Sequence, residues 1–404
     1  MSGLSLTLFL AYVFCGPVAW GAIGLASLIG RRRMRRLFRP APTLPAETAP
    51  RVTVLIPAKD EGERVRVCLE SVLAQDYPNF SVITIDDRST DDTGRILDDI
   101  AAAAPPGRVR SLHIEQGALP PGWLGKCHAL HVAAKEANGE WLMFVDSDVR
   151  LAPDAVRASV ALATSRDYHA LSLMASLECH TFLERLVLPL SACAWSVMHA
   201  ISVTNNDNRA PAFANGQFFL IRRSAYESVG GHESVRDLIT EDVELAQLLK
   251  HNGFRVRLVL GFQFVSTRMH ATLPQMLRGW GRIYSGTSRR SPWRIIGAAL
   301  FVVLCSFSGY AALGWGLIVA GREGWGGAAP WLIASLIHLG QLTGTLADVY
   351  RESGNPRRYA LLFPLGGSIL LAILAFAIRW CITGRIEWRG TVFQQPDRPS
   401  QMVR

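Results

Sequence analysis

The chain has 404 residues, of which 49% are hydrophobic, and it carries a formal net charge of +9. This length allows two or three domains, or one large domain with membrane segments. The charge does not indicate a nucleic-acid-binding protein, because the arginines flank long apolar runs. RRRMRR follows the first run, and Arg282, Arg289, Arg290 and Arg294 precede the second. Such charge is typical of the cytoplasmic side of membrane segments.

The first 30 residues form an apolar segment, Leu4 to Gly30, that is long enough to span a bilayer. A secretory signal peptide, the alternative, would have basic residues before a shorter apolar core. Here no charge precedes the segment and arginines follow it, so we expect a retained anchor with its N-terminus outside. We expect residues 31–50 to form a basic, proline-rich linker.

Residues 51–268 alternate between strand-like and helical patterns. The runs VTVLIP, SVITIDD, VRSLHIE and WLMFVDSD are rich in β-forming residues, and helical patterns cover Glu63–Gln75, Asp91–Ala103 and Lys126–Asn138. This alternation predicts an α/β domain with a mostly parallel sheet. Ligands bind beyond the carboxyl ends of the strands in such sheets. The polar strand ends PAKDE, DDRSTDD and DSD are therefore candidates for a site.

The remainder of the chain is membrane-like. We expect an amphipathic interface helix at 269–292, three transmembrane segments within 293–382 and a basic tail at 383–404. The apolar stretch Leu186–Val203 lies inside the α/β region, where it fits a core helix or a membrane-facing helix better than a span. Four spans would place the C-terminus outside, whereas the arginines of the tail favour the inside.

The seven cysteines, at 15, 68, 127, 179, 193, 305 and 381, are scattered and form no CxxC pair. Their odd number and spacing predict neither a disulfide framework nor a zinc site. This usage fits a reduced, cytoplasmic main domain. His128 and His131 lack a third ligand at metal spacing, and we expect them to be structural or surface residues.

Asp146 and Asp148 follow the buried strand WLMFV. An Asp-x-Asp pair arises by chance about once per 400 residues, so alone it decides nothing, and a solvated turn is then the more common interpretation. A pair of carboxylates at the ligand edge of a sheet, however, suits Mg²⁺ or Mn²⁺ completed by a diphosphate.

Further acidic and basic residues stand at other element ends. Asp87 ends the strand SVITIDD, and a helix that starts at Ser89 or Thr90 would carry Asp91 and Asp92 in its first turn. Glu241 and Asp242 begin a second helix, where they serve either as caps or as a general base. Lys126 and the arginines of QMLRGWGR are candidates for phosphate binding, with surface charge as the alternative.

Together these motifs resemble family 2 glycosyltransferases of the GT-A fold. VTVLIPAKDE, VITIDDRSTDDT, WLMFVDSDV, FANGQFFLIRRSAYESVGGH, TEDVEL and QMLRGWGR occur in the family's order over about 51–290. The membrane segments and GRIEWRGTVF resemble the branch of hopene-associated, carotenoid-associated and ceramide-type glucosyltransferases. VGGH is expected to form a turn, with Gly230 or Gly231 at positive φ.

The resemblance implies a role for each matching residue. Asp87 would contact the nucleotide base beside Ala58 and Glu61, Asp146 would lie near the ribose, and Lys126 would face the phosphates. Asp148 would bind the metal, and Asp242 would be the base, with Glu241 beside it. The residues that would close over the diphosphate and the acceptor are Gln275, Arg278 and Trp280.

Two residues depart from the family pattern. Asp60 stands where the family often has asparagine, and Gly279 is inserted before Trp280. The altered spacing argues against a processive polysaccharide synthase, in which the tryptophan would stack on a growing chain.

The resemblance implies an inverting transfer of a sugar from a nucleotide-diphosphate sugar, expected to be a UDP-sugar, to a lipid hydroxyl. The partners are then a donor, a membrane lipid acceptor and the bilayer, with the catalytic domain on the cytoplasmic side of a bacterial-type cell membrane. Transfer to polyprenyl phosphate, a processive synthase and a catalytically inactive scaffold are the alternatives.

Overall fold

The structure is a computed structural model that describes residues 3–33, 45–198, 204–209, 211–288, 291–383, 385–388 and 391–394. One unit holds the described residues of Met34–Glu178 and Ile201–Met269. The other holds those of Met1–Arg33, Cys179–Ala200 and His270–Pro396. Much of the predicted linker, Arg289, Arg290 and most of the basic tail lie outside the described residues.

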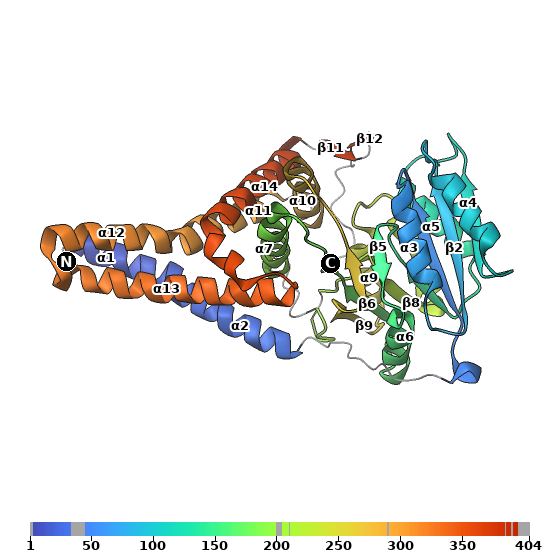
Figure 1. The fold of residues 1–404 in the computed structure, drawn as a ribbon, viewed down its shortest axis with the longest axis horizontal. Helices are drawn as coiled ribbons and strands as arrows, with labels where there is room; N and C mark the ends of the chain where they lie inside the picture. Colours follow the sequence, from blue (N-terminus) through green and yellow to red (C-terminus); the bar gives the residue numbers. More distant parts are fainter. Residues whose placement is uncertain are drawn as a thin grey trace. The chain divides into compact units, whose positions relative to one another are not determined.

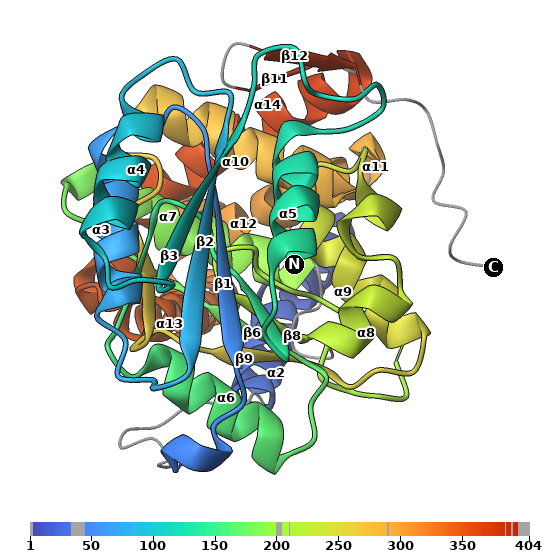
Figure 2. The same cartoon turned by 90° about the vertical axis from the view of Figure 1, so that its right-hand side faces the viewer.

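The first unit is built on a seven-stranded, mostly parallel sheet, as the sequence predicted (Figure 2). In spatial order its strands are β3 (Val109–Ile114), β2 (Phe80–Asp87), β1 (Val52–Ala58), β4 (Trp141–Phe144), β8 (Phe219–Arg222), β6 (Ala170–Met174) and β9 (Val256–Leu260). Strand β8 runs antiparallel to β4 and β6, whereas the other neighbouring pairs are parallel.

Helices cover both faces of this sheet. They are α3 (Glu63–Leu73), α4 (Thr93–Ala103), α5 (Gly125–Glu136), α6 (Ala155–Ser165), α8 (Arg223–Ser228) and α9 (Glu241–His251). Val54 and Ile56 of β1 enter a core shared with α3, α4 and α6, whereas Leu55 enters the core of α5, α8 and α9. Successive side chains of a strand point to opposite faces. Because both faces are covered, all seven residues of β1 are buried.

A small second sheet holds the segment that follows β4. It consists of β5 (Val149–Leu151), β10 (Val265–Thr267) and β7 (Ser176–Leu177). Strand β5 pairs antiparallel with β10, and the Thr267 hydroxyl donates to the carbonyl oxygen of Asp148 at 3.1 Å. The Asp146–Asp148 turn is thus fixed at both ends, by β4 and by β5.

The second unit is helical. Its α-helices are α1 (Gly3–Val13), α2 (Ala19–Arg33), α7 (Phe182–Met198), α10 (Leu273–Thr287), α11 (Pro292–Phe301), α12 (Ser308–Glu323), α13 (Trp325–Glu352) and α14 (Phe363–Thr383). Figure 1 shows α12 and α13 running alongside one another. The helical unit also contains a hairpin of β11 (Arg385–Trp388) and β12 (Thr391–Gln394).

Four helical segments of the described chain are long and apolar enough to cross a membrane: Ser5–Gly30, Pro292–Glu323, Trp325–Glu352 and Arg357–Thr383. They cover the four apolar stretches in which the sequence predicted spans. Large apolar side chains such as Leu8, Phe14 and Trp293 are exposed on these segments. Apolar exposure of this kind is what a lipid-facing surface requires.

Helix α7, which covers most of the apolar stretch at 186–203, is tied to other helices of this second unit. The Tyr350 hydroxyl of α13 donates to the Leu186 carbonyl at 2.7 Å, and the Tyr284 hydroxyl of α10 donates to the Ser191 carbonyl at 2.8 Å. Both tyrosines are buried. Helix α7 therefore serves as a packing surface for the helical unit, although it lies between α/β elements in the sequence.

Candidate active site

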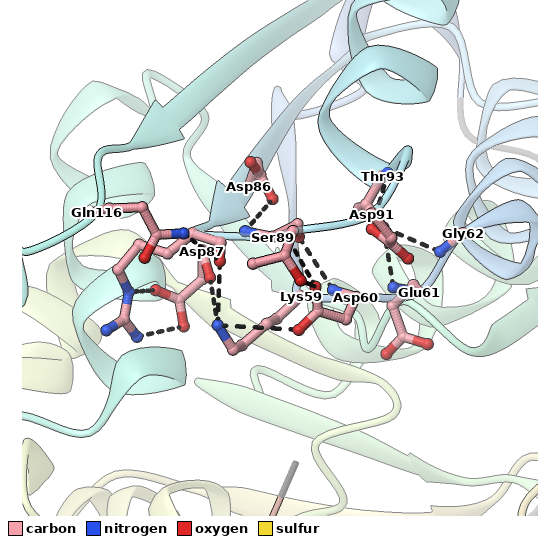
Figure 3. A network of polar contacts seen from close by, with 12 residues as sticks. Lys59, Asp60, Glu61, Gly62, Asp86, Asp87, Ser89, Asp91, Thr93 and Gln116 are labelled. Carbon is pink, nitrogen blue, oxygen red and sulfur yellow. Dashed lines mark hydrogen bonds and ion pairs between the residues drawn. The ribbon is translucent and has the colours of Figure 1, made fainter. Parts of the chain in front are cut away.

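The loops that follow β1 and β2 form one hydrogen-bonded network (Figure 3). The amides of Glu61 and Gly62 both donate to the Thr93 hydroxyl at 2.9 Å, and the Asp60 amide donates to the Ser89 hydroxyl at 3.0 Å. These two loops are brought together because β1 and β2 are parallel neighbours, with Ala58 paired to Asp86. The carboxyl edge of the sheet therefore has a fixed shape at the point where Ala58 and Glu61 were predicted to line a nucleotide pocket.

Asp87 lies at the end of β2 and is 4% exposed. Both of its carboxylate oxygens accept from the guanidinium group of Arg88, at 2.7 and 3.1 Å. Arg88 has φ 58°, a rare conformation for a residue with a side chain. Lys59 stabilises this turn by donating to the carbonyl oxygens of Asp87 and Arg88, at 3.3 and 3.1 Å. Gly125 of α5 faces this ion pair so closely that a Cβ atom there would overlap it.

Neither Asp91 nor Asp92 lies in the first turn of a helix, and that expectation is wrong. Helix α4 begins at Thr93, and the Asp91 carboxylate accepts from the Thr93 amide at 2.9 Å. Asp86 similarly accepts from the Ser89 amide at 3.2 Å. The carboxylates of Asp86, at the end of β2, and of Asp91 thus hold a turn, and the helix starts only after that turn is complete.

A hollow lies where α5, β4, β8 and α9 meet. Its polar lining comprises Lys126, Asp146, Gly216, His232, Glu241 and Asp242. The sequence predicted four of these six as site residues, and the six come from five separate segments of the chain. The apolar side chains beside them include Phe144 and Phe219, which are both buried.

Lys126 of α5 connects the end of β4 to the start of α9 through two ion pairs. Its ammonium nitrogen lies 2.7 Å from a carboxylate oxygen of Asp146 and 2.7 Å from one of Glu241. Burial by itself would lower the pKa of Lys126, but the carboxylates of Asp146, Glu241 and Asp242 raise it well above the ordinary value. Lys126 is therefore a permanent positive charge at the centre of the hollow.

Asp242 is the second residue of α9. Its two carboxylate oxygens accept from the backbone amides of Gly216 and Val243, at 2.6 and 2.8 Å. Burial and the neighbouring Glu241 raise the pKa of Asp242 to about 7, while Lys126 and the two amides oppose the rise. A carboxylate with this pKa can accept a proton and release it near neutral pH.

Asp148 stands among carboxylates rather than beside a lysine. Burial, Asp146 and Glu61 raise the pKa of Asp148 to about 7, and Lys126 lowers it only in part. Glu61 is held at this place by the Ser147 hydroxyl, which donates to it at 3.0 Å. Negative charges that raise the pKa of Asp148 in this way would be stabilised by a bound cation.

Within the described ranges, no three His, Cys, Asp or Glu side chains are arranged to hold an ion unaided. Mg²⁺ commonly takes only one or two protein carboxylates, with phosphate and water oxygens as its other ligands. The carboxylate of Asp148, with Asp146 and Glu61 nearby, fits a site in which the protein supplies only one or two ligands. Such a site would hold an ion that the diphosphate of a substrate completes.

The three residues predicted to close over the diphosphate and the acceptor belong to the helical unit. The Gln275 side-chain oxygen accepts from the amides of Ala271 and Thr272, so it caps the start of α10. Arg278 is exposed, whereas Trp280 is buried. The inserted Gly279 lies against the ring of His270, with no room for a side chain. The insertion thus has a local packing role.

Sequence reasoning did not identify Gly216 or His232 as site residues. Both occur in the motif FANGQFFLIRRSAYESVGGH, but no spacing rule marks either of them. The contact of Gly216 with Asp242 joins residues that are 26 positions apart, on different elements. His128 and His131, in contrast, pack against Trp123 and do not line the hollow, as expected for structural residues.

A mostly parallel sheet with carboxylates at its ligand edge, and with a helix-borne acid facing them, is the GT-A arrangement of a glycosyltransferase. Residues 50–280 match the family model described as "Glycosyltransferase like family 2", and the chain belongs to this family. The chain is therefore a glycosyltransferase, as the sequence motifs predicted.

A relative from Staphylococcus aureus (strain USA300), a 4,4'-diaponeurosporenoate glycosyltransferase, is 28% identical over 268 residues, which cover 65% of this chain and 67% of the relative. The chain also resembles a mannosyltransferase, PcManGT from Pyrobaculum calidifontis, solved in complex with GDP-Man and Mn²⁺. That likeness has a TM-score of 0.48 and 20% identity, and covers 82% of this chain and 98% of the other. A fragment of S. aureus TarS gives a TM-score of 0.37 at 15% identity, over 86% and 97% of the two chains.

Proposed function

We propose that this protein transfers a sugar, with inversion, from a nucleotide-diphosphate sugar to a hydroxyl group of a membrane lipid. The observation that carries the proposal is the state of Asp242. It is held by two backbone amides in a hollow, beside Glu241 and Lys126, with its pKa raised to about 7. A general base is most effective when its pKa is near the working pH.

Asp242 acts in this proposal by accepting the proton of the acceptor hydroxyl. The hydroxyl oxygen forms a bond to the anomeric carbon of the sugar as the bond from that carbon to the diphosphate breaks. Attack from the face opposite the leaving group inverts the anomeric carbon in one step. The two amides that bind Asp242 fix its orientation, and each of its oxygens still has a lone pair for the proton.

Lys126 gives the acids of the hollow different partners. Its ammonium nitrogen lies 2.7 Å from Asp146 and 2.7 Å from Glu241, whereas Asp242 is held by backbone amides. Glu241 in turn raises the pKa of Asp242. Closely spaced acids with different partners are a common way to obtain one group that takes up a proton near pH 7.

The donor is proposed to lie along the carboxyl edge of the sheet. Asp87, Ala58 and Glu61 would bind the nucleotide, expected to be uridine diphosphate, with Asp146 near the ribose and Asp148 at the metal. A Mg²⁺ or Mn²⁺ ion there would stabilise the negative charge that develops on the leaving diphosphate. The carboxylates around Asp148, with Lys126 offsetting them only in part, support a cation at this place.

The acceptor is proposed to be a lipid because of the composition of the helical unit. Four segments can cross a bilayer, and α10 is amphipathic, with Met276, Trp280 and Tyr284 buried and Arg278 exposed. The S. aureus relative is named for diaponeurosporenoate, an isoprenoid-type acceptor. Gln275, Arg278 and Trp280 are proposed to close over the diphosphate and acceptor, and the catalytic unit to face the cytoplasm.

An anionic acceptor is the second candidate. The ending of the name diaponeurosporenoate denotes a carboxylate, and such an acceptor, like polyprenyl phosphate, has no hydroxyl proton to lose. The raised pKa of Asp242 favours the hydroxyl, because an anionic nucleophile does not need a base. Replacing Asp242 with asparagine should therefore slow transfer to a hydroxyl about 100-fold or more, while leaving much of the transfer to an anion.

A screen of donors against acceptors tests the proposal. Membranes containing the full chain are supplied with UDP-glucose, UDP-galactose or GDP-mannose, and with an isoprenoid alcohol, a sphingolipid, an isoprenoid carboxylate or polyprenyl phosphate. Product masses should show one sugar added to each acceptor, which a processive synthase would not give.

Two aspartate variants accompany the screen. Asp148→Ala should lower turnover about 100-fold, as expected when a group that stabilises the leaving charge is removed. Asp99→Ala, which removes an exposed carboxylate paired with Arg95 on α4, should not. Failure of every donor would overturn the proposed function, and full turnover in Asp148→Ala would overturn the metal assignment alone.

A further inference from the structure

His232 is a buried histidine of the hollow to which sequence reasoning gave no chemical role. It is 2% exposed and lies in the 3₁₀ turn Gly231–Val235. Both preceding glycines have positive φ, 77° at Gly230 and 53° at Gly231, as the VGGH motif predicted for at least one of them. A Cβ atom on Gly231 would overlap the Tyr226 ring. The turn is thus built to bring His232 against Tyr226.

Two hydrogen bonds join His232 to Tyr226. The backbone amide of His232 donates to the tyrosine oxygen at 3.0 Å, and the same oxygen lies 2.9 Å from Nδ1 of the imidazole. Burial raises the pKa of Tyr226, so the phenol keeps its proton. Among the described residues, Nδ1 is the one acceptor placed within reach of the phenol O–H, since the amide can only donate, so we assign this O–H to Nδ1.

This arrangement fixes the tautomer of the imidazole. Nδ1 is the acceptor of the Tyr226 hydroxyl and carries no proton. Burial, with the positive charge of Lys126 and His131 in addition, lowers the pKa of His232 to about 3, so the ring is neutral at physiological pH. A neutral imidazole has one N–H, and here it is on Nε2.

The contacts of the His232 ring leave its Nε2 atom facing the hollow. Phe144 packs edge-on against the ring at 4.8 Å between centroids, and Tyr226 takes the Nδ1 side. Nε2 has no hydrogen-bond partner among the described residues, and it is not among their side-chain atoms buried without a partner. His232 also lines the hollow together with Lys126 and Asp146. A neutral donor therefore opens onto a space that is otherwise rich in carboxylate acceptors.

We propose that His232 determines sugar specificity, by donating its Nε2–H to one hydroxyl of the donor's sugar while a carboxylate of the hollow accepts from the same hydroxyl. A hydroxyl is the ligand group that suits both neighbours, because it accepts from an N–H and donates to a carboxylate. This inference rests on the proposed function, since it assumes a nucleotide-sugar donor. It adds the identity of a residue that recognises the sugar.

The test combines His232→Phe with deoxy analogues of the donor. Wild type and variant are compared with the best donor from the screen and with its analogues that lack one hydroxyl each. His232→Phe keeps an aromatic ring beside Phe144 but has no donor. For one analogue, the wild type should lose about tenfold in kcat/KM, the equivalent of 1.4 kcal/mol. His232→Phe should lose the same factor with the full donor, and nothing further with that analogue.

Control variants separate a sugar contact from a folding effect. His232→Gln, which can place an amide N–H near the Nε2 position, should recover part of the loss. His169→Phe should change kcat/KM less than twofold, because His169 packs on Phe254 outside the hollow. The affinity of free UDP or GDP, whichever nucleotide the donor carries, should be the same in His232→Phe and the wild type.

Two outcomes would overturn the inference. One is an equal loss in His232→Phe with the full donor and with every deoxy analogue, and the other is a matching loss of affinity for the free nucleotide. Either would show that the His232–Tyr226 pair serves only to pack the core. If the wild type transfers no sugar from any donor, it is the proposed function that has failed.

Discussion

Replacing Lys126 with methionine removes the positive charge at the centre of the hollow while keeping most of the side-chain volume. Lys126 pairs with Asp146 and Glu241 at 2.7 Å, and Glu241 is 5% exposed. Removing one partner of a fully buried ion pair typically costs on the order of 3–5 kcal/mol, whereas an exposed pair contributes about 0–1 kcal/mol. Because the side chains of Lys126 and Asp146 are 25% and 27% exposed, we expect an intermediate loss of about 1–3 kcal/mol in the free energy of unfolding, measured on solubilised protein at pH 8.

The pH dependence of this loss has a definite sign. Without Lys126, the folded-state pKa values of Asp148 and Asp242 rise further above their unfolded values. A group with a raised folded pKa favours the folded state below its unfolded pKa, and that contribution disappears as pH rises through the folded pKa. The variant should therefore be less destabilised at pH 5 than at pH 8.

The same substitution should shift the activity profile. Asp242 has a pKa of about 7, so about half of it is ionised at pH 7. Each unit by which its pKa rises costs about 1.4 kcal/mol, and the first unit reduces the ionised fraction at pH 7 to about one tenth. The acidic limb of kcat/KM against pH should move to higher pH in Lys126→Met.

Two controls accompany this experiment. Lys126→Arg keeps the charge and should shift the limb less. Lys250→Met removes a lysine of α9 that donates to the carbonyl oxygens of Thr204, Asn206 and Pro211, and it should not shift the limb. A profile of Lys126→Met that coincides with the wild type would refute the electrostatic account of the hollow.

Three further outcomes are expected. In the wild type, kcat/KM measured against pH should rise through about pH 7, because Asp242 must be ionised to accept a proton, and a flat profile from pH 5 to 9 would contradict this. Gly216→Ala should lower kcat about tenfold with little change in KM, because its Cβ would lie 3.1 Å from an Asp242 oxygen and 3.2 Å from the Lys126 nitrogen. Ala214→Gly, two residues earlier in the same loop, is its control. Removal of divalent cations by EDTA should abolish transfer, Mg²⁺ or Mn²⁺ should restore it, and activity that survives chelation would contradict a metal at Asp148.

The sheet was predictable because its strands carry their own signal. Every residue of β1 and β2 is buried, and both strands are short apolar runs bounded by polar turns. The acids at the strand ends were predictable for a related reason, since parallel strands bring their carboxyl ends to one edge. Asp242 was found from its place at the start of a helix.

The contacts that orient the site residues were not predictable, because they join residues far apart in the sequence. Asp242 is oriented by the amide of Gly216, and Lys126 joins segments that are distant in the chain. No local period encodes such pairs. The turn at His232 was predictable because it depends on the two glycines that precede it. The position of the proton on its ring was not, because it depends on the contact with Tyr226. Gln275 was predicted from a motif alone, and its contacts as a helix cap became visible only in the structure.

The most direct test of the central claim is the turnover number of Asp242→Asn with a hydroxyl acceptor and a nucleotide sugar. Asparagine keeps the size of the side chain and an oxygen that can accept from the amide of Gly216 or Val243, but it cannot take up a proton. If Asp242 is the general base, kcat should fall by a factor of about 100 to 10,000, with donor affinity nearly unchanged. A kcat within about threefold of the wild type would contradict the claim that Asp242 removes the acceptor's proton.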